Sequence, residues 1–318
     1  SRGSVFVAMI SLSHVSKLYD KVIGVNDLTI DLPPGAYGLV GPNGSGKTTF
    51  INLITGQLRP TLGSVQVLGF NPWKHRRVLR RIGLCPATDV LYPNVSALEW
   101  VTYQVRLHGF SRPESRERAV ESLGMVSMTN DMQRPMGSYS LGMRQRTKIA
   151  QAMAHQPDLL ILDEPYNGLD PVGRYQMTEL LKSLVASGKS VLFASHVLQE
   201  IEAVTSAFLL IYGGRLLASG TTAEIERILA GTPQEVVLHG DDVPRLIHRL
   251  ADQPWVESLQ LSDERRVLRV ALRDATELYR SLAHWIAEDG LQIDRFESAG
   301  SNLTAVFECL LRHHRGES

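Results

Sequence analysis

Residues 41–48 combine glycines, a lysine and a threonine in a spacing that suits the binding of phosphate groups. The segment reads Gly-Pro-Asn-Gly-Ser-Gly-Lys-Thr, which fits the whole pattern G-x-x-x-x-G-K-T. Glycines let the backbone turn its N–H groups toward one anion, and the helix that follows adds partial positive charge. Lys47 is expected to reach the terminal phosphates, and Thr48 to hold Mg²⁺. The sequence therefore predicts a phosphate-binding loop.

Two acidic residues and a histidine follow apolar runs further along the chain. Asp163 and Glu164 come after the run 159–162, and His196 follows the run 191–194. Side chains at the carboxyl ends of parallel strands face the ligands of open α/β sheets. Asp163 is expected to bind Mg²⁺ through water, and Glu164 to act as general base or to position the attacking water. The alternatives are an acidic pair that ends a strand and a structural histidine.

A second candidate anion site lies in the segment 139–146, Tyr-Ser-Leu-Gly-Met-Arg-Gln-Arg. Ser140 is predicted to be the N-cap of a helix whose first N–H groups stay free. Two anion sites in one chain cannot easily serve one phosphate from the same side. We therefore expect Ser140 and Gly142 to face a nucleotide that another subunit holds.

The composition excludes several classes of protein. The 318 residues include 33 Lys or Arg and 33 Asp or Glu. The chain thus has no basic excess that would favour binding of nucleic acid, and no acidic excess that would favour a disordered chain. The two cysteines, Cys85 and Cys309, are too few and too far apart to predict a disulfide framework or a metal site. The longest apolar runs have the length of strands rather than of a bilayer span. We interpret residues 1–8, ahead of Met9, as a cloning remnant.

The pattern of short apolar runs and helical periods predicts an α/β nucleotide-binding core in residues 9–232, with a helical subdomain at about 92–157. In the core, strands are expected at 10–15, 28–32, 64–68, 159–162 and 191–194, a helix at 175–186, and a hairpin at Gly213-Gly214. Residues 233–318 predict an accessory domain in the order β-α-β-β-α-β, which is ferredoxin-like, followed by a terminal helix. Its elements are expected at 235–238, 243–250, 256–261, 267–272, 275–287, 291–296 and 303–312.

These motifs, in this order, make the chain resemble the nucleotide-binding subunits of ATP-binding cassette (ABC) transporters over roughly residues 9–220. The resemblance implies the fold of a P-loop NTPase, an ABC ATPase core with a helical subdomain, that hydrolyses ATP with Mg²⁺. It implies catalytic roles for Glu164 and His196 and metal binding by Thr48 and Asp163. It also implies contact of the loop 167–171 with a partner subunit.

The residues expected to contact ATP are Tyr19, Gly41, Pro42, Asn43, Gly44, Ser45, Gly46, Lys47, Thr48, Thr49, Ser140 and Gly142. Tyr19 is expected to stack on adenine; its alternative is a core tyrosine at a strand end.

The chain departs from the family pattern at three positions. Ala87 stands where the family usually has a glutamine, and a methyl group can neither donate nor accept a hydrogen bond. Thr88 and Asp89 are candidate substitutes for that glutamine. Leu141 and Met143 replace the commonest residues of the signature segment, and the resulting Ser-Leu-Gly-Met resembles type-2 exporters. The basic run 74–81 we interpret as a solvated helix face rather than a patch for lipid headgroups or nucleic acid.

The resemblance implies an ATPase subunit that dimerises head to tail around two ATP molecules and drives an integral membrane permease on a separate chain. The second nucleotide-binding subunit is a copy or a near relative. The expected process is export, the expected place is the cytoplasmic face of the cell membrane as a peripheral protein, and no nucleic-acid partner is expected. The alternatives are a soluble ABC-type ATP switch and a nucleotide-sensing module with low turnover, which Ala87 favours.

Overall fold

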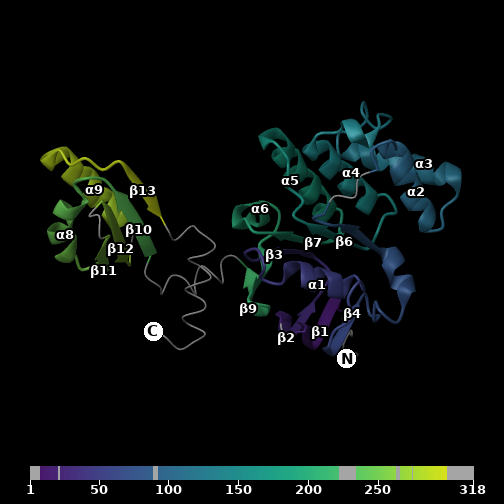
Figure 1. Cartoon of the computed structure of the whole chain (residues 1–318), viewed down its shortest axis with the longest axis horizontal. Coiled ribbons are helices and arrows are strands. Elements are labelled where there is room, and N and C mark those ends of the chain that lie inside the picture. The colour runs from purple at the N-terminus through teal and green to yellow at the C-terminus, as the bar shows by residue number, and fades with distance from the viewer. Residues whose placement is uncertain are drawn as a thin grey trace, which may run out of the picture. The chain divides into compact units, whose positions relative to one another are not determined.

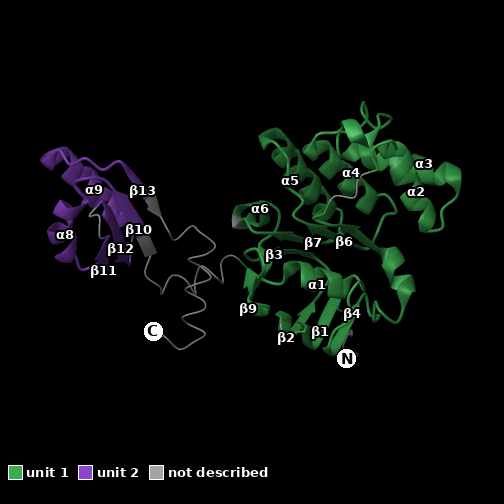
Figure 2. Cartoon of the chain, in the orientation of Figure 1, with its two compact units in different colours: residues 1–222 green, residues 223–318 purple. Residues whose placement is uncertain are grey.

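The computed structural model describes residues 8–20, 22–88, 92–221, 234–262, 266–273 and 275–298. The chain forms two compact units, residues 1–222 and 223–318 (Figure 2). The boundary expected near residue 232, residues 1–7 of the interpreted remnant, Asp89, Cys309 and the helix expected at 303–312 lie outside the described residues.

The first unit contains two sheets and most of the helices (Figure 1). Its strands are β1 (Ile10–Tyr19), β2 (Val22–Leu32), β3 (Ala36–Val40), β4 (Leu62–Val67), β5 (Ile82–Cys85), β6 (Leu159–Asp163), β7 (Ser190–Ser195), β8 (Ala207–Tyr212) and β9 (Arg215–Thr221). Its helices are α1 (Lys47–Ile54), η1 (Arg76–Arg81), α2 (Ala97–Leu107), α3 (Arg112–Met125), η2 (Met136–Ser138), α4 (Leu141–Met153), α5 (Pro171–Ala186) and α6 (Leu198–Glu202).

A six-stranded sheet positions the candidate site. Its order is β5-β6-β7-β3-β8-β9, in which the first five strands are parallel and β9 pairs antiparallel with β8. Every residue of β6 and β7 is buried, which explains their continuous apolar sequences. The β8–β9 hairpin turns at Gly213 and Gly214, whose φ angles of 54° and 75° suit glycine. The predicted mostly parallel α/β core is confirmed.

The strands β1, β2 and β4 lie outside the parallel sheet, which the sequence analysis did not predict. They form a separate antiparallel sheet in the order β2-β1-β4. Helix α1 runs between the two sheets, and residues of both sheets and of α1 share one apolar core (Figure 1). Apolar alternation predicts a strand but not which strand it pairs with. The strand expected at 28–32 is also longer, because β2 begins at Val22.

The helical subdomain consists of α2, α3 and α4, which pack together beyond β5 and β6. Helix α2 begins with a capping box in which Ser96 and Glu99 each bond the other's backbone N–H. Ser111 and Ser140 cap α3 and α4 in a simpler way. Helix α4 approaches β5 closely, since a Cβ at Gly83 would lie 2.1 Å from the carbonyl oxygen of Ala152. Glycine at this position lets α4 lie against the sheet.

The second unit is a four-stranded antiparallel sheet in the order β11-β12-β10-β13. Its elements are β10 (Gln234–His239), α8 (Val243–Ala251), β11 (Val256–Leu261), β12 (Val267–Leu272), α9 (Ala275–Asp289) and β13 (Arg295–Ser298). The chain order and the sheet order are those of the ferredoxin-like arrangement. The strand expected at 291–296 begins later, because Gln292 donates its backbone N–H to Asp242 instead of a neighbouring strand.

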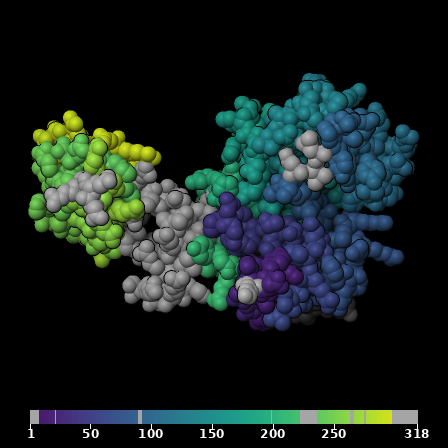
Figure 3. Space-filling view, viewed as in Figure 1, coloured from purple at the N-terminus to yellow at the C-terminus, as the bar shows by residue number. Residues whose placement is uncertain are grey.

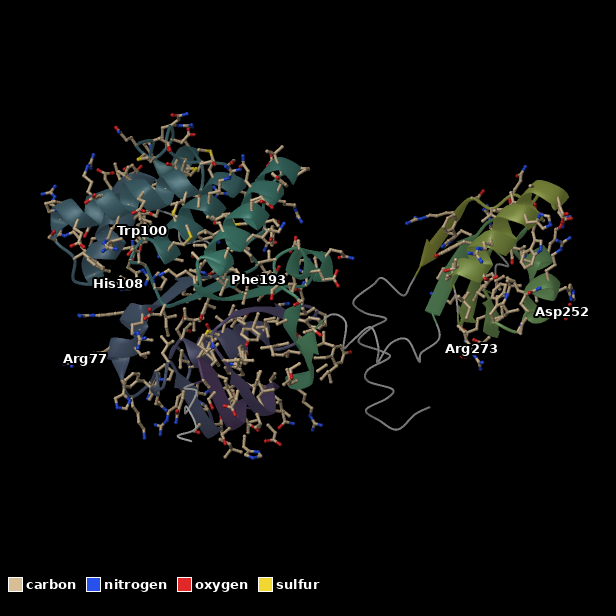
Figure 4. All side chains as sticks on the ribbon, turned by 180° about the vertical axis from the view of Figure 1, so that it is seen from behind. Arg77, Trp100, His108, Phe193, Asp252 and Arg273 are labelled. Atoms are coloured by element: carbon tan, nitrogen blue, oxygen red, sulfur yellow. The ribbon has the colours of Figure 1, made fainter. Side chains whose placement is uncertain are left out.

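A stacked pair of histidines joins the helical subdomain to β5. The rings of His108, which follows α2, and His155, which follows α4, lie 3.8 Å apart at 14° (Figure 4 labels His108). Nε2 of His155 lies 3.1 Å from the carbonyl oxygen of Ile82, so it is the donor. Burial, and to a smaller extent the neighbouring His108, lower the pKa of His155 to about 4. His155 is therefore neutral in the fold at neutral pH.

We expect the fold to lose stability in mild acid because of His155. The unfolded chain takes up the proton near pH 6.5, whereas the folded chain resists it until about pH 4. Stability present above pH 6.5 is thus lost as the pH falls toward 4, by about 2 kcal/mol between pH 7 and pH 4.5. Urea unfolding at these two pH values should show a smaller loss for His155→Phe, which keeps a planar ring without the titration. An equal loss in both proteins would contradict this assignment.

Candidate nucleotide-binding and catalytic site

The loop between β3 and α1 offers backbone N–H groups and a buried hydroxyl to an anion. Gly46, with φ at 110°, is the N-cap of α1, and no side chain caps this helix. The Ser45 hydroxyl is buried and has no hydrogen-bond partner among the described residues. A Cβ at Gly41 would lie 2.4 Å from both Ser45 Oγ and the carbonyl oxygen of Ile211. These features fit a phosphate group. Of the other predicted loop residues, Pro42 accepts from Ser45 N at 3.1 Å, and Asn43 and Gly44 are exposed.

Lys47 lies buried at the base of this loop. Its Nζ donates to the carbonyl oxygen of Gly41 at 2.6 Å and lies 3.6 Å from Oε1 of Glu164. Only 7% of the Lys47 side chain and 12% of the Glu164 side chain are exposed, so the two charges interact with little screening. The structure thus brings the predicted phosphate ligand and the predicted catalytic carboxylate together.

Thr48 and Asp163 form the pair of oxygen atoms that was predicted to hold Mg²⁺. Thr48 Oγ1 donates to Asp163 Oδ2 at 3.4 Å, although 115 residues separate the two positions. Asp163 is 3% exposed at the end of β6. Burial raises the pKa of its carboxyl, the neighbouring Glu164 raises it further, and Lys47 lowers it. A hydroxyl and a carboxylate are ligands that Mg²⁺ prefers, and a buried carboxylate that lacks enough positive charge fits a cation.

Glu164 has an unusual backbone conformation for a residue with a large side chain. Its φ is 52°, in the left-handed region. Its N–H donates to the carbonyl oxygen of Ala194 on the neighbouring strand at 3.0 Å. Its own carbonyl oxygen accepts from Nε2 of Gln145 at 3.3 Å, and that of Pro165 accepts from the same nitrogen at 3.2 Å. The carboxylate direction is therefore fixed by the backbone on both sides of the residue.

His196 follows β7 and contacts Glu164. Its Nδ1 lies 3.0 Å from Oε2 of Glu164, and about half of its side chain is exposed. Lys47 and His196 therefore contact the two oxygens of one carboxylate, and both residues follow the carboxyl ends of parallel strands, β3 and β7. The interpretation of His196 as a purely structural residue does not explain this exposed position beside Glu164.

Two residues of α4 belong to this site although the sequence analysis did not select them. Gln145 is 3% exposed and bonds the backbone around Glu164, as described above. One turn later, Lys148 Nζ donates to the carbonyl oxygens of Pro86 and Ala87 at 3.1 and 3.3 Å. The signal for them was their spacing of three residues, which puts both on one face of a helix. Only the fold shows that this face meets the ends of β5 and β6.

The signature segment lies beside the loop 167–171 rather than beside the phosphate loop. Ser140 Oγ accepts from Met143 N at 3.2 Å, so Ser140 is the N-cap that was predicted. A Cβ at Gly142 would lie 3.0 Å from the carbonyl oxygen of Gly168, and one at Gly168 would lie 2.4 Å from Leu141. In the described part of the chain, Ser140 forms no hydrogen bond with residues 41–48.

Tyr19 ends β1 close to the start of α1. Its hydroxyl lies 3.4 Å from Thr49 Oγ1, and 40% of the residue is exposed, which excludes the core tyrosine interpretation. Lys17 Nζ lies 5.4 Å from the ring centroid. The ring is thus available beside the phosphate loop.

Comparison with known proteins assigns the family. A family model described as "ABC transporter" matches residues 25–167. The chain is 31% identical over 306 residues to the daunorubicin/doxorubicin resistance ATP-binding protein DrrA of Streptomyces peucetius, covering 96% of this chain and 92% of the relative. The chain belongs to the ABC transporter family. It is also 34% identical to the Nod factor export ATP-binding protein I of Burkholderia thailandensis over 260 residues, 81% of this chain and 84% of the relative.

Solved ABC structures agree with this assignment. An ATP-binding subunit of an ABC transporter superposes with a TM-score of 0.63 at 27% identity, covering 69% of this chain and 92% of that structure. The dimeric bacterial ABC transporter cassette MJ0796 gives a TM-score of 0.63 at 26% identity, covering 67% and 98%. The protein is an ATP-binding and ATP-hydrolysing ABC transporter subunit.

We expect Gln145→Met to lower the turnover of ATP without weakening its binding. Methionine keeps the volume of the side chain but removes the amide that fixes the backbone of Glu164. A misplaced carboxylate should lower kcat about tenfold to hundredfold, with KM for ATP within about twofold. Steady-state ATPase measurements check this expectation.

The matched control is Gln151→Met on the same helix, which removes an acceptor from Trp100 and does not touch Glu164. Equal losses of kcat in both variants, or a raised KM in Gln145→Met alone, would contradict a positioning role.

Proposed function

We propose that the protein is the ATP-driven motor of an exporter, in which two nucleotide-binding subunits enclose two ATP molecules. The single observation that supports it most is the arrangement around Glu164. Its carboxylate lies between Lys47 and His196, beside the Thr48–Asp163 pair. These residues lie at the carboxyl edge of one sheet, which supports the proposed roles of a base, a phosphate ligand and a pair of metal ligands.

In this proposal each residue has one task. Glu164 accepts a proton from the attacking water or orients it, and His196 holds the other carboxylate oxygen. Lys47 exchanges its contact with the Gly41 carbonyl oxygen for the terminal phosphates, and the free Ser45 hydroxyl also faces the phosphates. Thr48 and Asp163 would hold Mg²⁺, which neutralises phosphate charge when bound.

The second anion site supports a dimer. Ser140 begins α4 with no hydrogen bond to its own phosphate loop among the described residues, so its helix N-terminus is available to another subunit's nucleotide. Large apolar side chains are exposed at the beginnings of α4 and α5, among them Leu141 at 50%, Val172 at 63% and Tyr175 at 66%. Such exposure suits a surface that a partner subunit covers in a dimer. The solved cassette MJ0796 is described as dimeric.

Closure of such a dimer on ATP and its opening after hydrolysis supply the mechanical step. ATP bridges the phosphate loop of one subunit and the Ser140 segment of the other, so it stabilises only the closed state. Cleavage by the Glu164-assisted reaction removes this bridge. The movement would then act on the helices of a membrane permease.

We expect Glu164→Gln to trap the closed dimer. Glutamine keeps the shape of the side chain but cannot accept the proton, so hydrolysis should fall by about a hundredfold or more while ATP still binds. Size-exclusion chromatography with light scattering should then detect a dimer that forms with ATP and Mg²⁺ and disappears in the double variant Lys47→Ala, Glu164→Gln. A Glu164→Gln protein that binds ATP and stays monomeric at all concentrations would refute the enclosed-nucleotide arrangement.

Export as the direction is supported by the names of the relatives, which are ATP-binding proteins of export, drug resistance and transport. These include Nod factor export in Burkholderia thailandensis, daunorubicin/doxorubicin resistance in Streptomyces peucetius and bacitracin transport in Bacillus licheniformis. Across its described residues the chain has no helix with the length and apolarity of a membrane span. We place the protein at the cytoplasmic face of the membrane, held there by the permease.

A low rate of hydrolysis in the isolated protein is favoured by Ala87. This residue is exposed, and its carbonyl oxygen accepts from Lys148, but its methyl group has no polar atom for the attacking water. Thr88 is also exposed. The backbone of Ala87 thus holds the loop in place, while its methyl side chain cannot bind the attacking water. A nucleotide-sensing module with low turnover therefore remains the second candidate function.

We expect Ala87→Gln to raise the ATPase rate of the isolated protein by about tenfold, since an amide at this position can orient the water. Comparison with Ala87→Leu, which adds similar bulk without an amide, isolates the polar contribution in steady-state assays. A brisk rate in the parent protein that Ala87→Gln leaves unchanged would overturn the assignment.

A further inference from the structure

A stretch of the first unit, residues 32–88, carries positive charge that no acidic residue within it balances. This stretch includes the segment between β4 and β5. Residues 32–88 contain seven Lys or Arg and no Asp or Glu, although the whole chain has 33 of each kind. Of the seven, Lys47 belongs to the nucleotide site, and Arg81 pairs with Asp158. The net charge of the whole chain is zero, but residues 32–88 have a local excess of positive charge.

Four of these cations lie together on the surface. They are Lys74, Arg76, Arg77 and Arg80, all exposed, and none forms an ion pair with a residue that the structure describes. The 3₁₀ helix η1 has three residues per turn, so Arg77 and Arg80 lie on the same edge of it. Val78 is buried on the opposite side, and Leu79 packs against the core. Figure 4 shows Arg77 at the outer edge of the unit, far from Phe193 in the sheet.

Two aromatic side chains are exposed next to these cations. Phe70 is 48% and Trp73 is 43% exposed, and the Phe70 ring lies 6.0 Å from that of His75. The side chain of Asn71 fixes the turn, because its Oδ1 accepts from the N–H groups of Trp73 and Lys74 at 3.0 Å each. The aromatic rings and the cations therefore form an ordered surface. Side chains of this blue-coloured stretch project from the unit in Figure 3.

We propose, in place of the solvated helix face expected from the sequence, that this basic-aromatic surface binds the anionic headgroups of a lipid bilayer. The surface is made of Phe70, Trp73, Lys74, Arg76, Arg77 and Arg80. Unpaired cations side by side repel each other, and an anionic surface removes that cost. Tryptophan favours the boundary between headgroups and acyl chains, where its ring is apolar and its N–H remains wet. An ABC transporter subunit works beside a membrane, so this ligand is within reach, whereas a nucleic acid is not required by the reaction.

None of the six residues belongs to the nucleotide site, so this inference is independent of the roles proposed for Glu164 and its neighbours. A protein that hydrolyses ATP normally but does not bind anionic vesicles would contradict this inference and leave the proposed function intact.

The test is sedimentation of the full chain with vesicles of phosphatidylcholine, with and without phosphatidylglycerol, at physiological salt. Each cation near an anionic surface strengthens binding about fivefold, so neutralising the four cations to glutamine should weaken binding to anionic vesicles by at least about tenfold. Binding of the parent protein should fall with added salt. ATP hydrolysis should stay unchanged in this variant.

The matched control neutralises four exposed cations that have acidic partners, and so changes the total charge equally. These are Lys182, Arg245, Arg273 and Arg280, which pair with Glu179, Asp242, Glu257 and Glu277. This control should keep most of the vesicle binding. Loss of binding to the same extent in both variants would show a response to net charge alone and would overturn the proposal.

Tryptophan fluorescence gives a second measurement that does not depend on charge. Binding to anionic vesicles should shift the emission of the parent protein to shorter wavelength, and Trp73→Tyr should abolish this shift. A shift that persists in Trp73→Tyr, or equal binding to neutral and anionic vesicles, contradicts the proposal. Tighter binding to a short DNA duplex than to anionic vesicles would assign the surface to nucleic acid instead.

Discussion

The site depends on the strained backbone of one residue at the end of a buried strand. Glu164 adopts φ = 52°, which costs a residue with a side chain about 1–3 kcal/mol. The surrounding bonds from Gln145 and to Ala194 help to hold this conformation. This turn is what sends the carboxylate of Glu164 toward Lys47 and His196 while Asp163, one residue earlier, faces Thr48. With an ordinary extended backbone at Glu164, the two acids would alternate across the strand and the constellation would not form.

The same crowding explains why the site suits a cation and an anion together. Burial, and then the adjacent carboxylate of Glu164, raise the pKa of Asp163, and Lys47 only partly compensates. Lys47 is in turn the group that phosphates would engage. If a phosphate draws Lys47 away from Glu164, the acidic pair would need another positive charge, which a divalent ion beside Thr48 and Asp163 would supply. Under the proposed function, binding of the two ligands would therefore be coupled through the electrostatics of three side chains.

Local sequence pattern predicted most of the elements but not their long-range relations. The buried runs that became β6 and β7, the cap at Ser140 and the ferredoxin-like order all follow from spacing and side-chain type. The separate sheet of β1, β2 and β4 was not predicted, because apolar alternation does not indicate which strand a given strand pairs with. Gln145 and Lys148 were missed for a related reason: nothing near them in sequence shows that one face of α4 meets the ends of two strands.

Helix α4 links the loop after β5 to the end of β6 by hydrogen bonds, although Ala87 stands where the family usually has a glutamine. Gln145 and Lys148 lie one turn apart, and both donate to backbone carbonyl oxygens, those of Glu164 and Pro165 on one side and of Pro86 and Ala87 on the other. Bonds to the backbone do not depend on which side chain stands at position 87. A shift of the loop after β5 would therefore be passed to the helix that begins with the signature segment, and to the strand end that carries Glu164. Under the proposed function, Ala87 removes only a polar contact with water, so it would lower the catalytic rate without breaking this hydrogen-bonded link.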